Sequence, residues 1–330
     1  MSNAQTTNAQ ISNARTADAP TGVVRRLDKA DLERVVAIDQ AIGDRSRYGF
    51  FERRVDAAIG DPAGYISLGY VEDGVVQGFV LAHILDGEFG GRHPIAVLDA
   101  IGVDRGARGH GGAHALLAEL QKAARGRGAR AVRTQASWPD EAIMHFLAAA
   151  GFQLGTRLVL DRPTARAPGE MRPGEEESEG QDLSQDRIAV RAMTLLDIPA
   201  VISIDRSVTG RDRSAYLHRK AEDVLKSRGL RMSMLAEIDG TPAGFVMARV
   251  DYGEFGQAEP EAVFDTIGVD PEFAGQNVGS VLLAQLLEQL ANLQVERVRT
   301  VVEWNNVELI AFLDKLGFRP TQNLTLALPL

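Results

Sequence analysis

The chain repeats itself over most of its length. Residues 24–162 align without a gap on residues 190–328, an offset of 166 positions. The matching stretches include Asp73-Gly74 with Asp239-Gly240, and Ile101-Gly102-Val103-Asp104 with Ile267-Gly268-Val269-Asp270. Solenoid repeats have periods of about 20 to 50 residues, so a longer period indicates that a whole domain is duplicated. A chain of 330 residues therefore holds two domains of ordinary size.

Composition divides the chain into four segments. Residues 1–21 are rich in Asn, Ala, Thr and Gln, and are typical of a disordered arm. Residues 163–187 hold three prolines and the run Glu175-Glu176-Glu177, which indicates a flexible acidic linker. We therefore expect two globular domains, at 22–162 and 188–330.

The overall composition excludes several classes of function. The formal net charge of −9 argues against nucleic acid as the main partner, because such binding needs a basic face. The absence of cysteine excludes disulfides, thiolate metal sites and a thiol nucleophile, and the six histidines lack metal-ligand spacing, so no metal is predicted. The polar N-terminus lacks the apolar core of a secretory signal, and no stretch approaches the roughly 18 apolar residues of a membrane span. We expect a cytoplasmic protein without membrane contact.

Both copies predict the same order of elements, β-α-α-β-β-β-α-β-α-β. Apolar residues at helical spacing predict helices, and alternation predicts strands. The Asp-Gly pairs predict tight hairpin turns. The expected fold is α/β, a mixed (α+β) sheet flanked by helices, with a last strand closing each copy. The expected strands are 23–27, 64–72, 75–85, 95–103 and 129–137 in the first copy, with 188–192, 230–238, 241–251, 261–269 and 295–303 in the second.

A glycine-rich loop lies between a strand and a helix in the first copy. It reads Val103-Asp104-Arg105-Gly106-Ala107-Arg108-Gly109-His110-Gly111-Gly112-Ala113. Small residues let successive amides point into one hollow, and a helix start adds free amides and a positive dipole end, so such a loop binds phosphate or pyrophosphate. Arg108 would add a charged donor at the mouth. The alternative is a tight turn that needs glycine for its backbone alone.

This loop resembles motif A of the Gcn5-related N-acetyltransferase (GNAT) family, whose pattern is Arg/Gln-x-x-Gly-x-Gly/Ala. Residues 108–113 fill that pattern, and the element order of both copies also resembles the family. The stretches 146–152 and 312–318, each ending in Gly-Phe, resemble motif B. The resemblance implies two tandem GNAT-like acyl-CoA N-acyltransferase domains with acetyl-CoA as co-substrate. It also implies that the strand before the loop pairs with the pantetheine arm, and that the strand after the next helix splays away to make room.

The resemblance also implies a set of cofactor-binding residues. The second copy has Ala274 where the first has Arg108, and Asn277 where the first has a glycine, so we predict that the first copy is the better pyrophosphate site. The expected residues are Ile101, Val103, Arg108, Gly109, His110, Gly111, Gly112 and Ala113 in the first copy, and Ile267, Val269, Gly275, Gln276, Asn277, Val278, Gly279, Ser280 and Asn306 in the second.

The reaction also needs groups that give and take protons. The motif B tyrosine that protonates the leaving thiolate in the family is replaced by Leu147 and Leu313. An attacking amine must be neutral, so a carboxylate base is expected. Asp99 and Asp265 lie on otherwise apolar strands, where burial could raise their pKa, although a structural bond to an arginine is the alternative. The candidates are Glu261, Asp99, Asp265, Glu88 and Glu254, and the last two could instead be solvated turn residues.

Two further groups of residues have more than one interpretation. The arginines around the second helix could line an acceptor site for an acidic group, or could be surface charges or partners of Asp39 and Asp205; they are Arg45, Arg47 and Arg53, which recur as Arg211, Arg213 and Arg219. Trp138 and Trp304 could wall an acceptor pocket, or could belong to the core.

The sequence thus predicts an N-acetyltransferase that moves an acetyl group from acetyl-CoA to a primary amine of a small molecule or peptide. A strand amide near Val103 or Val269 would polarise the thioester carbonyl. The alternative is an acyl-CoA sensor or an interaction scaffold in which one or both domains are inactive. The two copies could pack as a pseudo-dimer within a monomer, or the chain could form a homodimer.

Overall fold

The computed structural model describes residues 22–43, 46–85, 93–165, 187–226, 231–252 and 260–330. Within them, all strands join one sheet of 12 strands in the order β1-β2-β3-β4-β5-β12-β6-β11-β10-β9-β8-β7. Only β4 with β5 and β10 with β11 pair in parallel, and the other neighbours are antiparallel. The predicted mixed sheet with flanking helices is confirmed.

The two copies carry matching elements at the predicted places. The first copy contains β1 Val23–Arg26, α1 Leu32–Gly43, α2 Tyr48–Gly60, β2 Tyr65–Glu72, β3 Val75–Leu85, β4 Ile95–Val103, α3 Gly112–Arg125, β5 Ala131–Ser137, α4 Glu141–Ala149 and β6 Gln153–Pro163. The second contains β7 Ile188–Ala192, α5 Ile198–Thr209, α6 Ser214–Lys226, β8 Arg231–Ile238, β9 Thr241–Tyr252, β10 Pro260–Val269, α7 Val278–Asn292, β11 Arg297–Glu303, α8 Val307–Lys315 and β12 Arg319–Pro329.

The predicted hairpin turns are present in both copies. Asp73 and Gly74 have φ of 49° and 77°, and Asp239 and Gly240 have φ of 52° and 78°. Two consecutive residues with positive φ match the twist of antiparallel strands, which is why Asp-Gly is favoured there.

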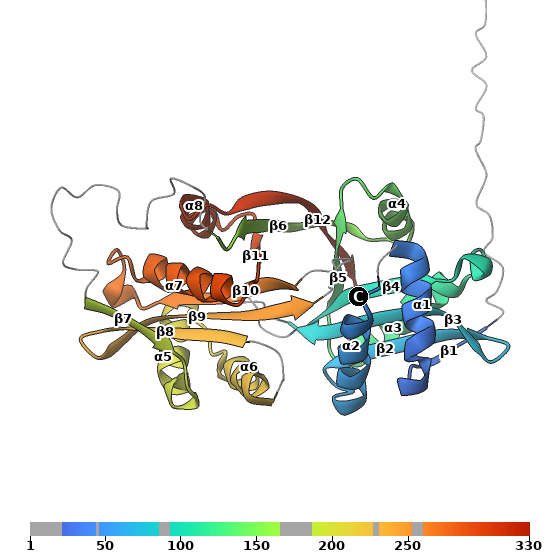
Figure 1. Cartoon of the computed structure of the whole chain (residues 1–330), viewed down its shortest axis with the longest axis horizontal. Helices are drawn as coiled ribbons and strands as arrows, with labels where there is room; N and C mark the ends of the chain where they lie inside the picture. The colour runs from blue at the N-terminus through green and yellow to red at the C-terminus, as the bar shows by residue number, and fades with distance from the viewer. Residues whose placement is uncertain (1–21, 44–45, 86–92, 166–186, 227–230, 253–259) are drawn as a thin grey trace, which may run out of the picture.

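The sequence had led us to expect that the last strand of each copy closes that copy. This expectation is wrong. Instead β12 pairs with β5 of the first copy, β6 pairs with β11 of the second, and β6 and β12 pair with each other. Figure 1 shows these two strands running between the halves. The copies therefore exchange their final strands, and one continuous sheet joins them.

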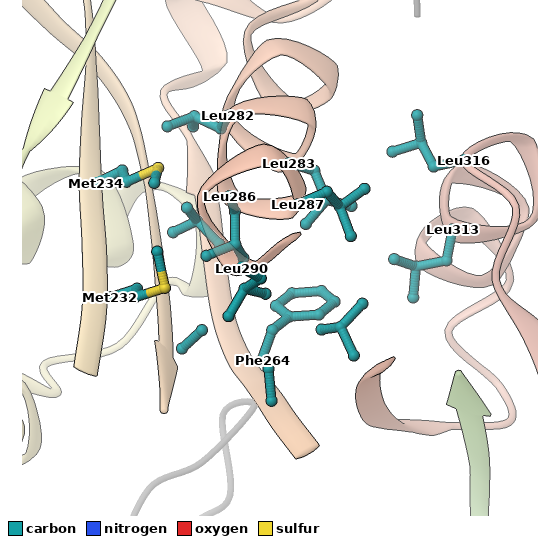
Figure 2. Close-up of a cluster of buried hydrophobic side chains, with 14 of the residues drawn as sticks. Met232, Met234, Phe264, Leu282, Leu283, Leu286, Leu287, Leu290, Leu313 and Leu316 are labelled. Atoms are coloured by element: carbon teal, nitrogen blue, oxygen red, sulfur yellow. The ribbon is translucent and has the colours of Figure 1, made fainter. Parts of the chain in front are cut away.

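Each half keeps its own apolar core. In the second half, the α7 leucines that recur at helical spacing belong to this core, and Leu282, Leu283, Leu286 and Leu290 are fully buried. Figure 2 shows them between Met232 and Met234 of β8 on one side and, on the other, Leu313 of α8 and Leu316, which directly follows that helix. The first half has the matching cluster under α3, and a second one under α1 and α2. Helix α3 and helix α7 therefore hold the glycine-rich loops against the sheet in both halves.

The strand exchange predicts that the two copies stay together without the connection between them. We expect residues 1–170 and 180–330, expressed as two separate chains, to purify as a one-to-one complex. The reason is that the ladders from β6 to β11 and from β12 to β5 each hold seven residue pairs. Native mass spectrometry and size exclusion would measure the association. Two pieces that elute separately and remain folded would contradict the exchange.

Candidate functional site

A gap opens between two parallel strands in each half. In the first half β4 pairs with β5 only at Ala96 with Val132 and Val97 with Arg133. In the second half β10 pairs with β11 only at residues 261–263. Beyond these pairs, Thr134 Oγ1 of β5 still donates to the carbonyl of Leu98 at 3.1 Å. From Asp99 to Val103 in β4 and from Asp265 to Val269 in β10, the ladder partners lie on one neighbouring strand alone. The predicted splay is therefore present in both copies.

The gap begins at a β-bulge in both halves. The register between β3 and β4 shifts between Leu81 and Ala82, which leaves Asp99 as the extra residue on β4. The register between β9 and β10 shifts in the same way around Asp265. A bulge bends its strand and increases the local twist, so each buried aspartate lies where the two parallel strands part.

The first glycine-rich loop leads from the gap to α3. Gly109 and Gly111 have φ of 89° and 75°, and Gly111 is the N-cap residue of α3. The helix starts at Gly112, so the amides of its first turn, including that of Ala113, have no acceptor within the helix. In the described part of the chain, no backbone carbonyl accepts a hydrogen bond from the amides of residues 109–111. Arg108 and His110 are exposed beside these amides, so the loop can hold an anion.

The second loop keeps this backbone shape with a different residue. Asn277 is the N-cap residue of α7 and has φ 61° and ψ 9°, the left-handed conformation that Gly111 has in the first copy. Asparagine tolerates this conformation better than most residues. The amide of Gln276 donates to the carbonyl of Phe273 at 3.3 Å, so one amide of this loop is already used. Gly275 has φ 79° in the turn, Gly279 and Ser280 lie in the first turn of α7, and Val278 is buried in the core.

The side chain of Tyr70 packs against the first loop at Gly112 and His110. Its ring is fully buried, and a Cβ on Gly112 would lie 2.6 Å from the ring atom Cδ1, so this position requires glycine. The Tyr70 hydroxyl donates to Glu72 at 2.7 Å and lies 3.4 Å from the carbonyl oxygen of His110. In the second copy the same two positions are Ala236 and Val278, both buried. The larger side chain of the pair is thus on the strand in the first copy (Tyr70) and on the helix in the second (Val278). The sequence analysis missed Tyr70, although the paired exchange between the copies was visible.

Asp99 is held by two basic groups. It is completely buried, with His83 Nδ1 at 2.9 Å and Arg54 Nε at 3.3 Å. Burial alone raises the pKa of this carboxyl, but Arg54 and His83 outweigh it, and the pKa lies below its ordinary value. The expectation that burial raises this pKa is therefore wrong, and a carboxylate with a lowered pKa is a weak base.

Asp265 has the same environment with different partners. Lys220 of α6 donates to one carboxylate oxygen, and Arg249 of β9 donates to the other at 2.8 Å. Burial raises the pKa of Asp265, but Lys220 and Arg249 more than compensate and keep it below its ordinary value. Positions 54 and 83 correspond to 220 and 249, so this acid with two basic partners is duplicated. The sequence analysis did not identify these four partners, although all of them recur at matching positions as basic residues.

The remaining candidate residues have the following surroundings. Glu261 is buried at the start of β10 and forms an ion pair with Arg299 at 2.9 Å. Glu88 and Glu254 lie outside the described residues. Asn306 is the N-cap residue of α8, and its side-chain oxygen accepts from the amide of Leu309 at 3.2 Å. Leu147 and Leu313, at the family's tyrosine position, are buried in the two cores.

The surroundings of Arg47 and Arg213 favour the ion pairs, and the exposure of the two tryptophans excludes the core. Arg47 contacts Asp39 with Nε at 3.0 Å, and Arg213 contacts Asp205 in the same way at 3.0 Å, so these pairs connect the first two helices of each copy. Trp138 and Trp304 are 68% and 65% exposed, so neither belongs to the core.

Within the described residues, no cluster of three or more His, Asp or Glu side chains could hold a metal ion. None of the helices there is both long and apolar enough to cross a membrane.

Paired strands that part at a bulge, with a glycine-rich helix start at the open end, define an acyltransferase fold in each half. The family model described as the acetyltransferase (GNAT) family matches twice, at residues 33–152 and 200–318. The chain therefore belongs to the acetyltransferase (GNAT) family and carries two of its domains in tandem.

Several solved structures match along both halves of the chain. A tandem GNAT protein from the clavulanic acid biosynthesis pathway matches with a TM-score of 0.63 at 18% identity, over 93% of this chain and 98% of that one. A GCN5-related N-acetyltransferase from Sphaerobacter thermophilus matches with a TM-score of 0.59 at 15% identity, over 94% and 96%. A glucosamine N-acetyltransferase region of a fungal multi-domain β-N-acetylglucosaminidase matches with a TM-score of 0.62 at 15% identity, over 94% of this chain and 38% of that one. No curated protein matches the sequence.

The exchange of volume between Tyr70 and Gly112 predicts an energetic coupling. We expect Gly112→Val alone to destabilise the first half by about 1–3 kcal/mol or more, because the side chain would overlap the Tyr70 ring. The double variant Tyr70→Ala/Gly112→Val reproduces the pair found in the second copy, and should be more stable than the sum of the two single changes by at least about 1 kcal/mol. Chemical denaturation of all four proteins measures the coupling, and strictly additive effects would contradict this packing.

The ion pairs of Asp265 predict a stability effect that depends on pH. We expect Asp265→Asn to cost about 3–5 kcal/mol near neutral pH, because Lys220 and Arg249 lose a buried partner. Since the folded pKa lies below the unfolded value of about 3.9, the wild type loses this stabilisation as pH falls below about 4, and the two proteins should converge there. Asp314→Asn is the control, because Asp314 pairs with Arg319 in solvent and its removal should cost under about 1 kcal/mol. A difference from the wild type that is constant down to pH 2 would be inconsistent with an ionised Asp265.

Proposed function

We propose that the protein transfers an acetyl group from acetyl-CoA to a primary amine of a small molecule or peptide. The observation that carries the proposal is the gap between β4 and β5, which opens onto a loop of free amides at Gly109–Ala113. A strand edge without ladder partners suits an extended, amide-containing arm such as pantetheine, which can pair with it as an added strand would. The loop at its end suits the pyrophosphate of the same molecule.

The residues of the first half have separable parts in this reaction. The loop amides and Arg108 bind the pyrophosphate. The unpaired part of β4 between Asp99 and Val103 pairs with the pantetheine arm, and an amide near Val103 polarises the thioester carbonyl. No tyrosine stands at the usual place of the acid, since Leu147 is buried there, so the thiolate leaves with a proton from water or from the base.

The second half is proposed to bind acyl-CoA more weakly. It has Ala274 in place of Arg108, and the amide of Gln276 already donates to Phe273. These two features favour the second candidate function for this half, a binding or scaffolding domain without turnover. Isothermal titration calorimetry with acetyl-CoA tests this difference between the halves. A single tight site per chain would support it, and two sites of equal affinity would contradict it.

Arg108 provides the direct test of the proposed pyrophosphate site. We expect Arg108→Ala to weaken acetyl-CoA binding by about 1.5–3 kcal/mol, which is the value of a hydrogen bond to a charged group. Arg105→Ala is the matched control, because Arg105 is exposed in the same loop but lies outside the motif, and its removal should leave the affinity within about threefold. Isothermal titration calorimetry of the three proteins measures the effect. An unchanged affinity in Arg108→Ala would place the pyrophosphate elsewhere.

A further inference from the structure

The buried aspartate at the bulge meets different basic groups in the two halves. In the first half the partners are Arg54 and His83, and in the second they are Lys220 and Arg249. Among these four, histidine is the side chain that exchanges a proton in the neutral range, whereas arginine keeps its charge. The two halves therefore differ in proton chemistry at equivalent positions of the sheet.

His83 lies at the closed end of the gap. It pairs in register with Val97 of β4, and Val97 in turn pairs with Arg133 of β5. Val97 is the last residue of β4 that pairs with β5, and Asp99 of the bulge follows two residues later. The backbone of His83 therefore lies opposite the residue of β4 at which the gap ends, and its imidazole contacts Asp99, the bulge residue beside the gap.

The ring of His83 has a defined orientation. Its Nδ1 lies 2.9 Å from the Asp99 carboxylate. Because an ionised carboxylate only accepts hydrogen bonds, Nδ1 is the donor in this contact, and Nε2 is the ring nitrogen left to exchange a proton with a substrate. No described residue forms a hydrogen bond with Nε2. Besides His83, the charged groups that act on Asp99 are Arg54 of α2 and, more weakly, Arg249 of β9. The ring of Tyr65 lies 6.3 Å from the His83 ring between centroids.

We propose, on the basis of the proposed function, that His83 is the general base of the first half and that Arg249, at the equivalent position of the second half, cannot act as one. Nε2 of His83 takes a proton from the acceptor amine as the amine nitrogen forms its bond to the acetyl carbon. The bond between that carbon and sulfur breaks, and the electron pair leaves on the CoA thiolate. The imidazolium then returns the proton to the thiolate, directly or through water. Asp99 acts as a positioning residue that fixes the ring and stabilises the imidazolium.

The variant His83→Arg separates this role from a structural one. It installs the residue that the second copy uses at the same position, where Arg249 pairs with the equivalent aspartate at 2.8 Å. The ion pair with Asp99 can therefore persist, but the side chain can no longer accept a proton. We expect CoA release with the best primary amine of a panel of lysine, spermidine, glucosamine and tyramine to fall by at least about 100-fold, the usual contribution of a general base. The melting temperature and the acetyl-CoA affinity should stay close to wild type.

The control is His218→Gln, an exposed histidine of α6 in the second half, which should keep the wild-type rate. Loss of less than tenfold in His83→Arg, with acetyl-CoA still bound, would overturn the assignment. A melting temperature that drops sharply calls for the milder His83→Gln, which removes the base without adding bulk. Full activity in that variant would equally overturn it.

A second measurement needs no acceptor. Diethyl pyrocarbonate modifies neutral histidine nitrogens, and mass spectrometry locates the modified residues. We expect acetyl-CoA to slow the modification of His83 at least tenfold and to leave that of His218 unchanged. Binding of acetyl-CoA by calorimetry without protection of His83 would refute this inference alone. Absence of acetyl-CoA binding would refute the proposed function, and the inference with it.

Discussion

The strand exchange sets the geometry on which both candidate sites depend. Strand β5 pairs with only two residues of β4, but with seven residues of β12 from the other copy. Strand β11 likewise has three pairs with β10 and seven with β6. The outer wall of each gap is therefore fixed by the last strand of the opposite half. A splayed pair of strands needs such support, because a strand with few hydrogen bonds on one edge is held in place mainly by the ladder on its other edge.

The sequence predicted the elements well and their final pairing wrongly. The duplication placed every strand and helix, and the Asp-Gly turns and the leucines of α3 and α7 fixed the faces that are buried. The exchange of β6 and β12 could not be predicted, because the two strands are copies of each other. Either one offers the same pattern to β5 or β11, so local propensity does not discriminate between closed and exchanged copies.

The prediction for Asp99 failed for a different reason. Its position on an apolar strand correctly indicated burial, and burial alone would raise its pKa. The outcome was decided by Arg54 and His83, which are distant in sequence and reach the carboxylate only through the packing of α2 and β3. The duplication did hold the signal, because positions 54 and 83 are basic again at 220 and 249. A buried acid that recurs together with two basic residues indicates a conserved ion-pair cluster within the chain, and such acids are ionised.

The divergence between the copies separates what the fold requires from what the chemistry requires. The volume shared by Tyr70 and Gly112 is kept as Ala236 and Val278, and the left-handed turn of Gly111 is kept as Asn277. These changes preserve packing and backbone shape, so both halves retain the gap and the loop. By contrast, Arg108 becomes Ala274 and His83 becomes Arg249, and neither change preserves the charge or proton chemistry of the first copy. Selection for a stable sheet explains the first set of changes but not the second. If only one half turns over substrate, the other remains necessary because it supplies β12, the strand that holds the active gap open.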